Sequence, residues 1–433
     1  MLVFVTADEA VRSVKSHDHI HISSAAQVPY CLIEALQKRA DAGDLTDIHF
    51  HQSYSDGPAP FADPKYENVF FDQAFFVGPA VRKSVNQGIA DYVPIHLSQT
   101  QQVYRDGTVP CDVAMVLVSE PDENGYVSLG GDVVCSIGAI EVAKTVIGVV
   151  NKNVPFTYGD AVVPISHFTY FVRDDRPLVE MISFEPTPTE VLIGKQCAEL
   201  IDDGACLQIG VGGLTNALAV QLKDHKNLGL HSETFADGVL GLIKSGVING
   251  QNKLIDKGKV VASFLLGSKE VFDFVDHNPS VMMMDVGYTN DPYIIGRNPK
   301  VASVNAATQV DLTGQVCADS VGSRIISGTG GQLEFVRGAA LSKGGVSIIA
   351  LSARSKKGTS KIVPSLDLSS GVVTPRADVQ WIVTEFGAVN LRGKSLQERA
   401  KLLISIAHPD DQEMLDRAAF ERFGNHFKTI SVY

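Results

Sequence analysis

Short apolar segments of strand length alternate with amphipathic segments along nearly the whole chain. Residues 17–39, "HDHIHISSAAQVPYCLIEALQKR", predict a strand, a turn of small residues and a helix. The pattern continues to the C-terminus, with further strands predicted at 301–312, 344–353 and 379–389, and helices at 395–408 and 410–424. The first of these two helices opens with Ser395 and Glu398 at capping-box spacing. Because such alternation is typical of parallel sheets covered by helices, we expect an α/β protein.

At 433 residues the chain is longer than one ordinary domain. The segment 173–191, "RDDRPLVEMISFEPTPTEV", interrupts the periodic pattern with charges and three prolines, and we predict a linker there. The unit at 17–39 has a counterpart at 204–224, "GACLQIGVGGLTNALAVQLKD", where a glycine-rich turn replaces "SSAA". We therefore expect two related α/β domains, at residues 1–180 and 190–433, each with a mainly parallel sheet flanked by helices.

Composition narrows the class of protein. Hydrophobic residues make up 45% of the chain and charged residues 20%, which is typical of a globular protein. The net charge of -12 disfavours nucleic acid or an anionic membrane as a partner. The N-terminus reaches Asp8 and Glu9 without a preceding positive charge, which does not fit a secretory signal, so we expect a cytoplasmic location. Six scattered cysteines without a C-x-x-C pair indicate reduced thiols.

Two glycine-rich loops are candidates for binding an anion or an oxyanion. Gly210, Gly212 and Gly213 stand between a predicted strand and a predicted helix, where backbone N–H groups can face a negatively charged ligand. A second loop, "SGTGGQ" (327–332), is similarly rich in glycine. Neither loop matches a dinucleotide or Walker motif, and each could instead be a packing turn.

Charged and histidine-rich segments offer other candidates. The segment "RSKKGTSK" (354–361) contains four cations and no acid, so it could receive an anionic ligand or form a solvated loop. His17, His19 and His21 alternate along one strand, and His49 and His51 lie on another, an arrangement that can bind a metal. No carboxylate or later histidine completes such a site, and we expect no metal.

Glu233, in "LGLHSETFADG" (228–238), lies between an apolar strand and a helix. An acid at this place commonly caps the helix, as Ser232 and Asp237 could also do. The chain has no G-x-S-x-G motif and no Cys/His pair that would supply another nucleophile. Glu233 is therefore either a cap or the nucleophile. If it is the nucleophile, the cap falls to Ser232 or Asp237.

Taken in order, the motifs resemble the acetyl-CoA hydrolase/transferase family, and within it the 4-hydroxybutyrate and butyryl-CoA:acetate type of CoA-transferase. The resemblance runs through nearly the whole chain and rests on segments such as "FFVGPAVRKSVNQGIADYVPIHLS", "PDENGYVSLG", "LQIGVGGLTNAL", "LGLHSETFADGV", "SGTGGQLEFVRGAALSKGG" and "IVTEFGAVNLRGKS". It implies a CoA-transferase, NagB/RpiA-like fold. The N-terminal turn "SSAAQVP" departs from the glycine-rich turn that is usual in the family.

The resemblance also implies roles for particular residues. Glu233 corresponds to the nucleophile, and Gly330 to the glycine whose amide serves CoA or the oxyanion. Asn305 and Glu385 correspond to further active-site residues. The CoA-binding residues fall on Gly210, Val211, Gly212, Gly213 and Leu214, together with Gly330 and Lys357, although the register could instead place Lys356 at the lysine position.

The implied activity is transfer of CoA between a short-chain acyl-CoA and a free carboxylate such as acetate, through a glutamyl-CoA thioester. A free glutamate has a pKa of about 4.3, so we expect Glu233 to be ionised without a partner base. CoA is then substrate and covalent intermediate, with no tightly bound cofactor, and the protein is expected to be a homo-oligomer, a dimer. Alternatives are an acyl-CoA hydrolase, a metal-dependent hydrolase that uses the histidines, and a non-catalytic CoA-binding protein.

Overall fold

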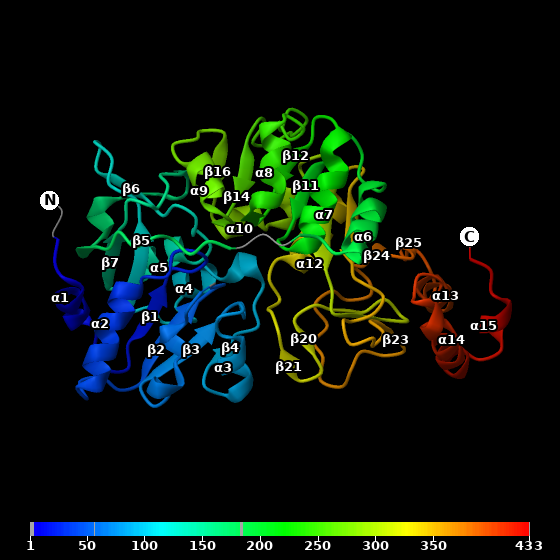
Figure 1. Ribbon diagram of the computed structural model, residues 1–433, viewed down its shortest axis with the longest axis horizontal. Helices are drawn as coiled ribbons and strands as arrows, with labels where there is room; N and C mark the ends of the chain where they lie inside the picture. The colour runs from blue at the N-terminus through cyan, green and yellow to red at the C-terminus, as the bar shows by residue number, and fades with distance from the viewer. Residues whose placement is uncertain (1–3, 56, 182–184, 433) are drawn as a thin grey trace.

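The computed structural model describes residues 4–55, 57–181 and 185–432. Its strands form two large sheets, one from the N-terminal half and one almost entirely from the C-terminal half. The N-terminal half lies at one end of the elongated molecule, and helices α13 to α15 lie at the other end with the C-terminus (Figure 1). No helix in the described ranges is long and apolar enough to cross a membrane.

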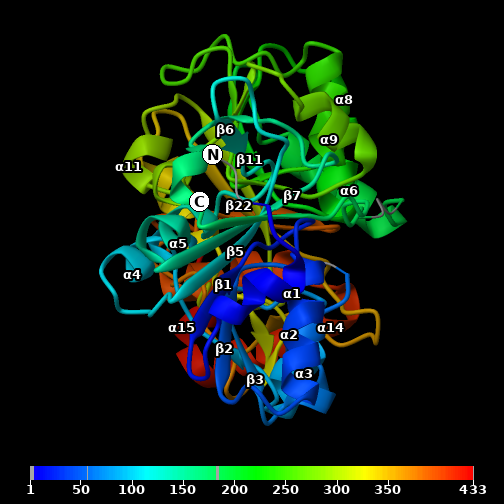
Figure 2. The same cartoon turned by 90° about the vertical axis from the view of Figure 1, so that its left-hand side faces the viewer.

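The N-terminal sheet has seven strands, all parallel, and confirms the predicted α/β architecture. In spatial order the strands are β10 (Tyr170–Arg173), β7 (Thr145–Val150), β5 (Val113–Val118), β1 (His19–Ile22), β2 (Ile48–Gln52), β3 (Phe70–Ala74) and β4 (Asp91–Tyr92). The helices of this half are α1 (Ala7–Ala10), α2 (Tyr30–Asp41), α3 (Arg82–Gln87), α4 (Gln102–Arg105) and α5 (Ser136–Val142). Helices α1 and α2 lie on one side of the strands and α4 and α5 on the other (Figure 2), which explains why the continuous apolar run of β5 is fully buried.

The second sheet has nine strands, and every pair is parallel except the terminal β24–β25 hairpin. In spatial order the strands are β25 (Gly387–Asn390), β24 (Trp381–Thr384), β22 (Val346–Ala350), β17 (Val301–Ala306), β11 (Cys206–Ile209), β12 (Gly229–His231), β14 (Val260–Ala262), β16 (Val281–Met283) and β8 (Tyr158–Gly159). Its edge strand β8 comes from the N-terminal half of the chain. The largest apolar cluster likewise joins residues of both halves, for example Val133, Leu207 and Leu265. The proposed division at residues 1–180 and 190–433 stays a prediction.

The C-terminal half contains most of the helices. They are α6 (Pro188–Ala198), α7 (Gly213–Gln221), α8 (Asp237–Lys244), α9 (Lys269–Val275), α10 (Val286–Thr289), α11 (Pro292–Ile295), α12 (Gln332–Leu341), α13 (Leu396–Ser405), α14 (Pro409–Phe423) and α15 (His426–Thr429). The predicted capping box at Ser395 and Glu398 is confirmed at the start of α13.

The remaining elements are short. Small sheets contain β6 (Tyr126–Ser128), β9 (Val162–Pro164), β13 (Thr234–Phe235), β15 (Phe264–Leu265), β18 (Gln309–Asp311), β19 (Val316–Cys317), β20 (Ser320–Val321), β21 (Arg324–Ile325) and β23 (Ile362–Val363). Single turns of 3-10 helix are η1 (Val11–Ser13), η2 (Pro60–Ala62), η3 (Pro64–Tyr66), η4 (Leu97–Gln99), η5 (Ile165–His167) and η6 (Leu222–Asp224).

The predicted linker at 173–191, of which residues 182–184 lie outside the described ranges, overlaps a regular element at each of its ends. Strand β10 ends at Arg173, but helix α6 already begins at Pro188. Thr187 caps this helix in a capping box with Glu190, and Pro188 occupies the first turn. Proline is well tolerated at the first helical position because its missing N–H has no intrahelical partner there. Of the three prolines in this segment, Pro188 therefore belongs to the start of a helix and not to a linker.

Candidate active site

Glu233 lies at the carboxyl end of a strand in the middle of the nine-stranded sheet. Strand β12 ends at His231, and two residues later Glu233 precedes β13. The backbone carbonyl of Glu233 accepts hydrogen bonds from the N–H groups of Ser263 (2.9 Å) and Phe264 (3.0 Å). The main chain at Glu233 is thus fixed by the segment that follows β14. Carboxyl ends of parallel strands are where α/β proteins commonly place ligands.

The side chain of Glu233 is held by Asn290, a residue that no sequence motif indicates. Asn290 Nδ2 donates to Glu233 Oε2 at 2.9 Å and also to Glu334 Oε2 at 2.9 Å. Asn290 ends helix α10 and is fully buried. The first of these hydrogen bonds spans 57 residues and the second 44. In the sequence, Asn290 follows a short apolar segment and precedes Asp291 and Pro292, which by itself indicates only a turn.

The second glycine-rich loop contacts the same carboxylate. A Cβ atom on Gly331 would lie 2.0 Å from Glu233 Oε2 and 2.1 Å from Asn290 Nδ2, so any larger residue there would displace these two groups. Gly331 is also the N-cap residue of α12, which places Glu233 at the positive end of that helix. Gly330, the predicted glycine, is one residue further away: it has φ +56°, and a Cβ there would approach Phe76 at 3.0 Å. Its carbonyl accepts from Leu97 N at 3.2 Å.

The structure corrects the expectation that Glu233 is fully ionised at neutral pH. Burial raises the pKa of Glu233 to about 7, and the negative charge of Glu334 acts in the same direction. The hydrogen bond from Asn290 opposes the shift because it stabilises the ionised form. The side chain is half-buried, and among the described residues the carboxylate exchanges part of its hydration for one side-chain amide donor, Asn290. A carboxylate of raised pKa is a more basic atom and hence a stronger nucleophile when it is deprotonated.

Glu233 does not cap the helix that follows it, and neither Ser232 nor Asp237 does so. Helix α8 begins at Asp237 with Ala236 as N-cap and without a side-chain capping hydrogen bond. Ser232 Oγ donates to the carbonyl of Ile209 at 3.0 Å, and the Asp237 carboxylate accepts from Ser268 N at 2.9 Å. The capping prediction for these two residues is therefore wrong, because strand β13 separates Ser232 from the helix and Asp237 already lies inside it.

The first glycine-rich loop lies beside Glu233, at the end of the neighbouring strand β11. Gly210, Val211 and Gly212 follow this strand, and α7 begins at Gly213 and Leu214. A Cβ atom on Gly213 would lie 2.6 and 2.7 Å from the two carboxylate oxygens of Glu190 in α6. Oε2 of the same carboxylate accepts from Thr187 N and Oγ1, both at 2.8 Å, in the capping box of α6. A negative charge thus already lies against Gly213, which disfavours a second anion at that residue.

Asn305 lies next to this loop. It is part of strand β17 and exchanges hydrogen bonds with the side chain of Gln208, at 3.2 and 3.1 Å, and donates to Ser303 Oγ at 2.9 Å. It lines a cavity of about 80 Å³ together with Gly210, Val211, Leu214 and five other residues. Within the described residues, no hydrogen bond joins Asn305 to Glu233.

Glu385 and the basic segment line a larger cavity of about 780 Å³ that also contains Gly213 and Glu190. The carboxylate of Glu385 accepts from Ala353 N at 2.8 Å. Lys356 is one of the lining residues, whereas exposed Lys357 is not. Glu385 therefore lies with the basic segment and the first loop rather than in the cluster around Glu233.

The basic segment is less positive than its sequence suggests. Arg354 is paired with the carboxylate of Asp411, at 2.6 and 2.8 Å, and with Asp410 at 3.1 Å, both at the start of α14. Lys361 is partly buried, and burial lowers its pKa while the charge of Glu385 raises it. Lys356 and Lys357 remain as the exposed cations of the loop.

The histidines form a packed stack. The rings of His19 and His49 stack with centroids 4.6 Å apart, and His19 Nδ1 lies 2.9 Å from His51 Nε2. His21 is fully buried between Tyr104 (3.2 Å) and Ser136 (3.0 Å). Burial lowers the pKa of both His21 and His51 to about 3. Among the described residues no group of three or more potential ligands is arranged to hold a metal ion.

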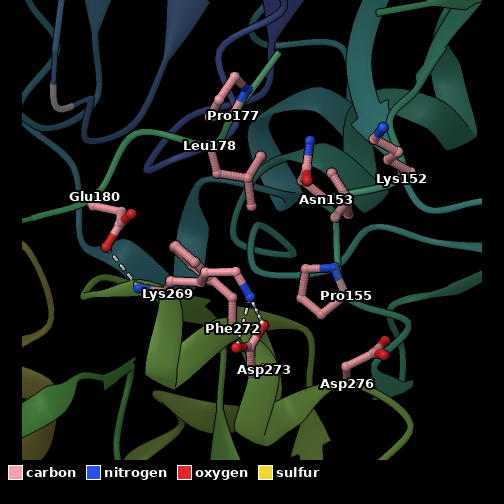
Figure 3. Close-up of a pocket in the computed structure, with 11 residues that line it drawn as sticks. Lys152, Asn153, Pro155, Pro177, Leu178, Glu180, Lys269, Phe272, Asp273 and Asp276 are labelled. Carbon is pink, nitrogen blue, oxygen red and sulfur yellow. Dashed lines mark hydrogen bonds and ion pairs between the residues drawn. The ribbon is translucent and has the colours of Figure 1, made fainter. Parts of the chain in front are cut away.

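A separate cavity of about 400 Å³ lies where residues 152–155 and 177–180 face helix α9 (Figure 3). The side chain of Lys269 in this cavity forms an ion pair with Asp273, and the backbone N–H of Lys269 donates to Glu180 Oε2 at 2.8 Å. The cavity contains none of the predicted site residues.

Comparison with known proteins assigns the chain to a family. Residues 3–183 match the acetyl-CoA hydrolase/transferase N-terminal domain, and residues 267–419 match the C-terminal domain of the same family. The chain belongs to the acetyl-CoA hydrolase/transferase family. The resemblance seen in the sequence motifs is thereby confirmed.

Relatives and solved structures of this family match nearly the whole chain. The 4-hydroxybutyrate coenzyme A transferase of Clostridium kluyveri is 41% identical over 97% of each chain. The succinyl-CoA:acetate/propanoyl-CoA:succinate CoA transferase of Fasciola hepatica is 42% identical over 96% of this chain and 87% of its own. The crystal structure of 4-hydroxybutyrate CoA-transferase from Porphyromonas gingivalis superposes with a TM-score of 0.83 at 35% identity, covering 97% of this chain and 98% of that one. By contrast, the acetyl-CoA hydrolase of Saccharomyces cerevisiae is 25% identical over 91% of this chain and 83% of its own.

Proposed function

We propose that this protein is a CoA-transferase that moves CoA between a short-chain acyl-CoA, such as 4-hydroxybutyryl-, butyryl- or acetyl-CoA, and a free carboxylate such as acetate. The observation that supports this most directly is the position of the Glu233 carboxylate and the contacts that hold it there. Its carboxylate is held by Asn290 at 2.9 Å, against Gly331 and the start of α12. A carboxylate fixed next to a helix N-terminus can attack a thioester while the negative charge that develops remains close to N–H donors.

In the proposed cycle a Glu233 oxygen attacks the acyl-CoA carbonyl carbon, and the C–S bond breaks to give an acyl-glutamyl anhydride and CoA thiolate. The thiolate then attacks the glutamyl carbonyl carbon, the C–O bond breaks, and the acyl group leaves as a carboxylate. Glu233 is left as a CoA thioester. The acceptor carboxylate reverses both steps and departs as the new acyl-CoA. Protons balance over the whole cycle because one carboxylate enters and one leaves.

Each attack places negative charge on a carbonyl oxygen. Preorganised backbone N–H groups stabilise such an oxyanion by about 3 kcal/mol per donor. We assign this task to the loop of Gly330 and Gly331, since the loop precedes α12 and contacts Glu233. The helix dipole of α12 acts in the same direction.

The CoA moiety is proposed to bind along the first glycine-rich loop and the adjoining cavity. Gly210 to Leu214 lie beside the end of β12, and the cavity of about 780 Å³ contains Gly213, Glu385 and Lys356. Lys356 or Lys357 would meet a phosphate of CoA, and Asn305 and Glu385 would line the path between that phosphate and Glu233. Because Glu190 is already placed at Gly213, we expect the phosphates to lie nearer the lysines than the start of α7.

Mass spectrometry of the protein after incubation with acyl-CoA alone tests this function. We expect a CoA thioester on Glu233 that is absent in Glu233→Ala. Glu270→Gln, which removes an exposed carboxylate of α9, serves as the matched control and should still form the adduct. Wild-type protein that forms no adduct would contradict the proposal. Steady release of CoA without an acceptor acid would instead assign a hydrolase, because water then replaces the acceptor.

A cytoplasmic location and assembly into a homodimer are further parts of the proposal. Size-exclusion chromatography with light scattering measures the second of these directly.

A further inference from the structure

Two carboxylates share the side-chain amide of Asn290. Its Nδ2 atom lies 2.9 Å from Glu233 Oε2 and 2.9 Å from Glu334 Oε2, so each of its two hydrogens has one acceptor. Asn290 Oδ1 is buried and has no hydrogen-bond partner within the described residues. A reversed amide would bring that oxygen against two carboxylate oxygens, which cannot donate when ionised. The two acids together therefore fix which way the amide faces.

Glu334 is itself held firmly. It lies in the first turn of α12, and only 6% of its surface is exposed. Its two carboxylate oxygens accept from the backbone N–H of Ser98 in η4, at 3.2 and 3.4 Å. The helix dipole favours an acid in the first turn of a helix, so the dipole of α12 stabilises the ionised carboxylate of Glu334.

We propose that Glu334 is a positioning residue for the transfer reaction: it holds the amide of Asn290, and that amide holds the carboxylate of Glu233 in the orientation needed for attack. This inference rests on the proposed role of Glu233 as nucleophile. Glu334 acts through Asn290, since its own hydrogen bonds go to Asn290 and Ser98.

Glu334 also acts through its charge. The titratable groups that face it are Glu233, from the turn after β12, and Asp291, from the start of α11. Burial raises the pKa of Glu334, and the hydrogen bonds from Ser98 and Asn290 lower it. Because the negative charge of Glu334 raises the pKa of Glu233, a neutral residue at position 334 should make Glu233 more acidic.

The same contact links the nucleophile to the N-terminal half of the chain. Ser98 N bonds Glu334, and the adjacent Leu97 N bonds the carbonyl of Gly330 at 3.2 Å. One short turn, η4, thus fixes both the amide that holds Glu233 and the glycine loop that contacts it.

Two substitutions separate orientation from charge. Glu334→Gln keeps an oxygen that can accept from Asn290 but removes the charge, whereas Glu334→Ala removes both. We expect the acid limb of the pH profile of kcat/KM, which reports the free enzyme, to move to lower pH in Glu334→Gln, because the charge that raises the pKa of Glu233 is removed. In Glu334→Ala we expect kcat to fall about tenfold or more, because the Asn290 amide is no longer held in the orientation that positions Glu233. KM for acyl-CoA should change by less than about threefold, because this amide lies away from the proposed CoA site.

The matched control is Glu413→Gln, which removes an equally negative but exposed carboxylate of α14. It should leave both kcat and the pH profile unchanged. The inference is overturned if wild-type protein forms the Glu233-linked CoA thioester while both Glu334 variants retain wild-type kcat and an unshifted acid limb. Wild-type protein that forms no thioester overturns the proposed function, and the inference with it, before any variant is compared.

Discussion

The Glu233 carboxyl group lowers the stability of the folded protein at neutral pH. Its pKa is raised from 4.5 to about 7, so the folded state binds this proton more tightly than the unfolded state does. The free energy of unfolding therefore falls as the pH rises between these two values. We expect Glu233→Gln to be more stable than wild type at about pH 8, by up to about 3 kcal/mol, and to lose this advantage near pH 4.5.

Urea unfolding at the two pH values measures this difference. The control Glu270→Gln, on the exposed face of α9, should change the free energy of unfolding by the same amount at both pH values. An equal stability difference between Glu233→Gln and wild type at the two pH values would mean that the pKa of Glu233 is not raised by folding.

At the residue scale the sequence indicated Glu233, the proposed nucleophile, but not the residues that surround it. The local pattern around Glu233 also fitted a helix cap, and the family resemblance of the motifs favoured the nucleophile, a role that stays a prediction. Asn290 and Glu334 were missed because their contact with Glu233 arises only when distant segments meet. The raised pKa of Glu233 was missed for the same reason, since burial is a property of the fold.

At the scale of elements the sequence predicted helices and strands well and their mutual contacts poorly. Helix α7 begins at the predicted glycines, but the glycine-rich turn also accommodates Glu190 of α6, which is 23 residues away in sequence from Gly213. The predicted strand at 379–389 is a hairpin of β24 and β25. Periodicity alone does not distinguish one long strand from two short ones joined by a tight turn.

The loop 354–361 supports a prediction about which lysine meets CoA. Arg354 is already paired with Asp410 and Asp411, and Lys356 lines the cavity whereas Lys357 does not. We expect Lys356→Ala to raise KM for acyl-CoA about tenfold, the effect of losing one hydrogen bond to a charged group, and the matched control Lys357→Ala to change it by less than about twofold. Both effects should shrink in high salt. The opposite order in steady-state kinetics would place Lys357 at the phosphate.

At the scale of the whole molecule, the two halves are joined more closely than two tandem domains would be. Strand β8 of the N-terminal half completes the edge of the second sheet, and one apolar cluster includes residues of both halves. The alternation of strands and helices predicted both sheets, because it is local. This alternation could not predict that β8 pairs with β16 of the second sheet, since a two-residue strand has no periodicity to detect.

The junction between the halves includes the glycine loop itself, and this leads to a last prediction. Tyr92 of β4 accepts from Thr329 N at 2.8 Å and bonds Thr329 Oγ1 at 3.0 Å, next to Gly330. Tyr92→Phe leaves that N–H unpaired, so we expect kcat to fall about tenfold with KM for acyl-CoA little changed. Asn86→Ala also removes two hydrogen bonds between the halves, those to Ile325, but does not touch the loop. If both variants lowered kcat equally, contact between the halves in general, rather than the position of the loop, would govern the reaction.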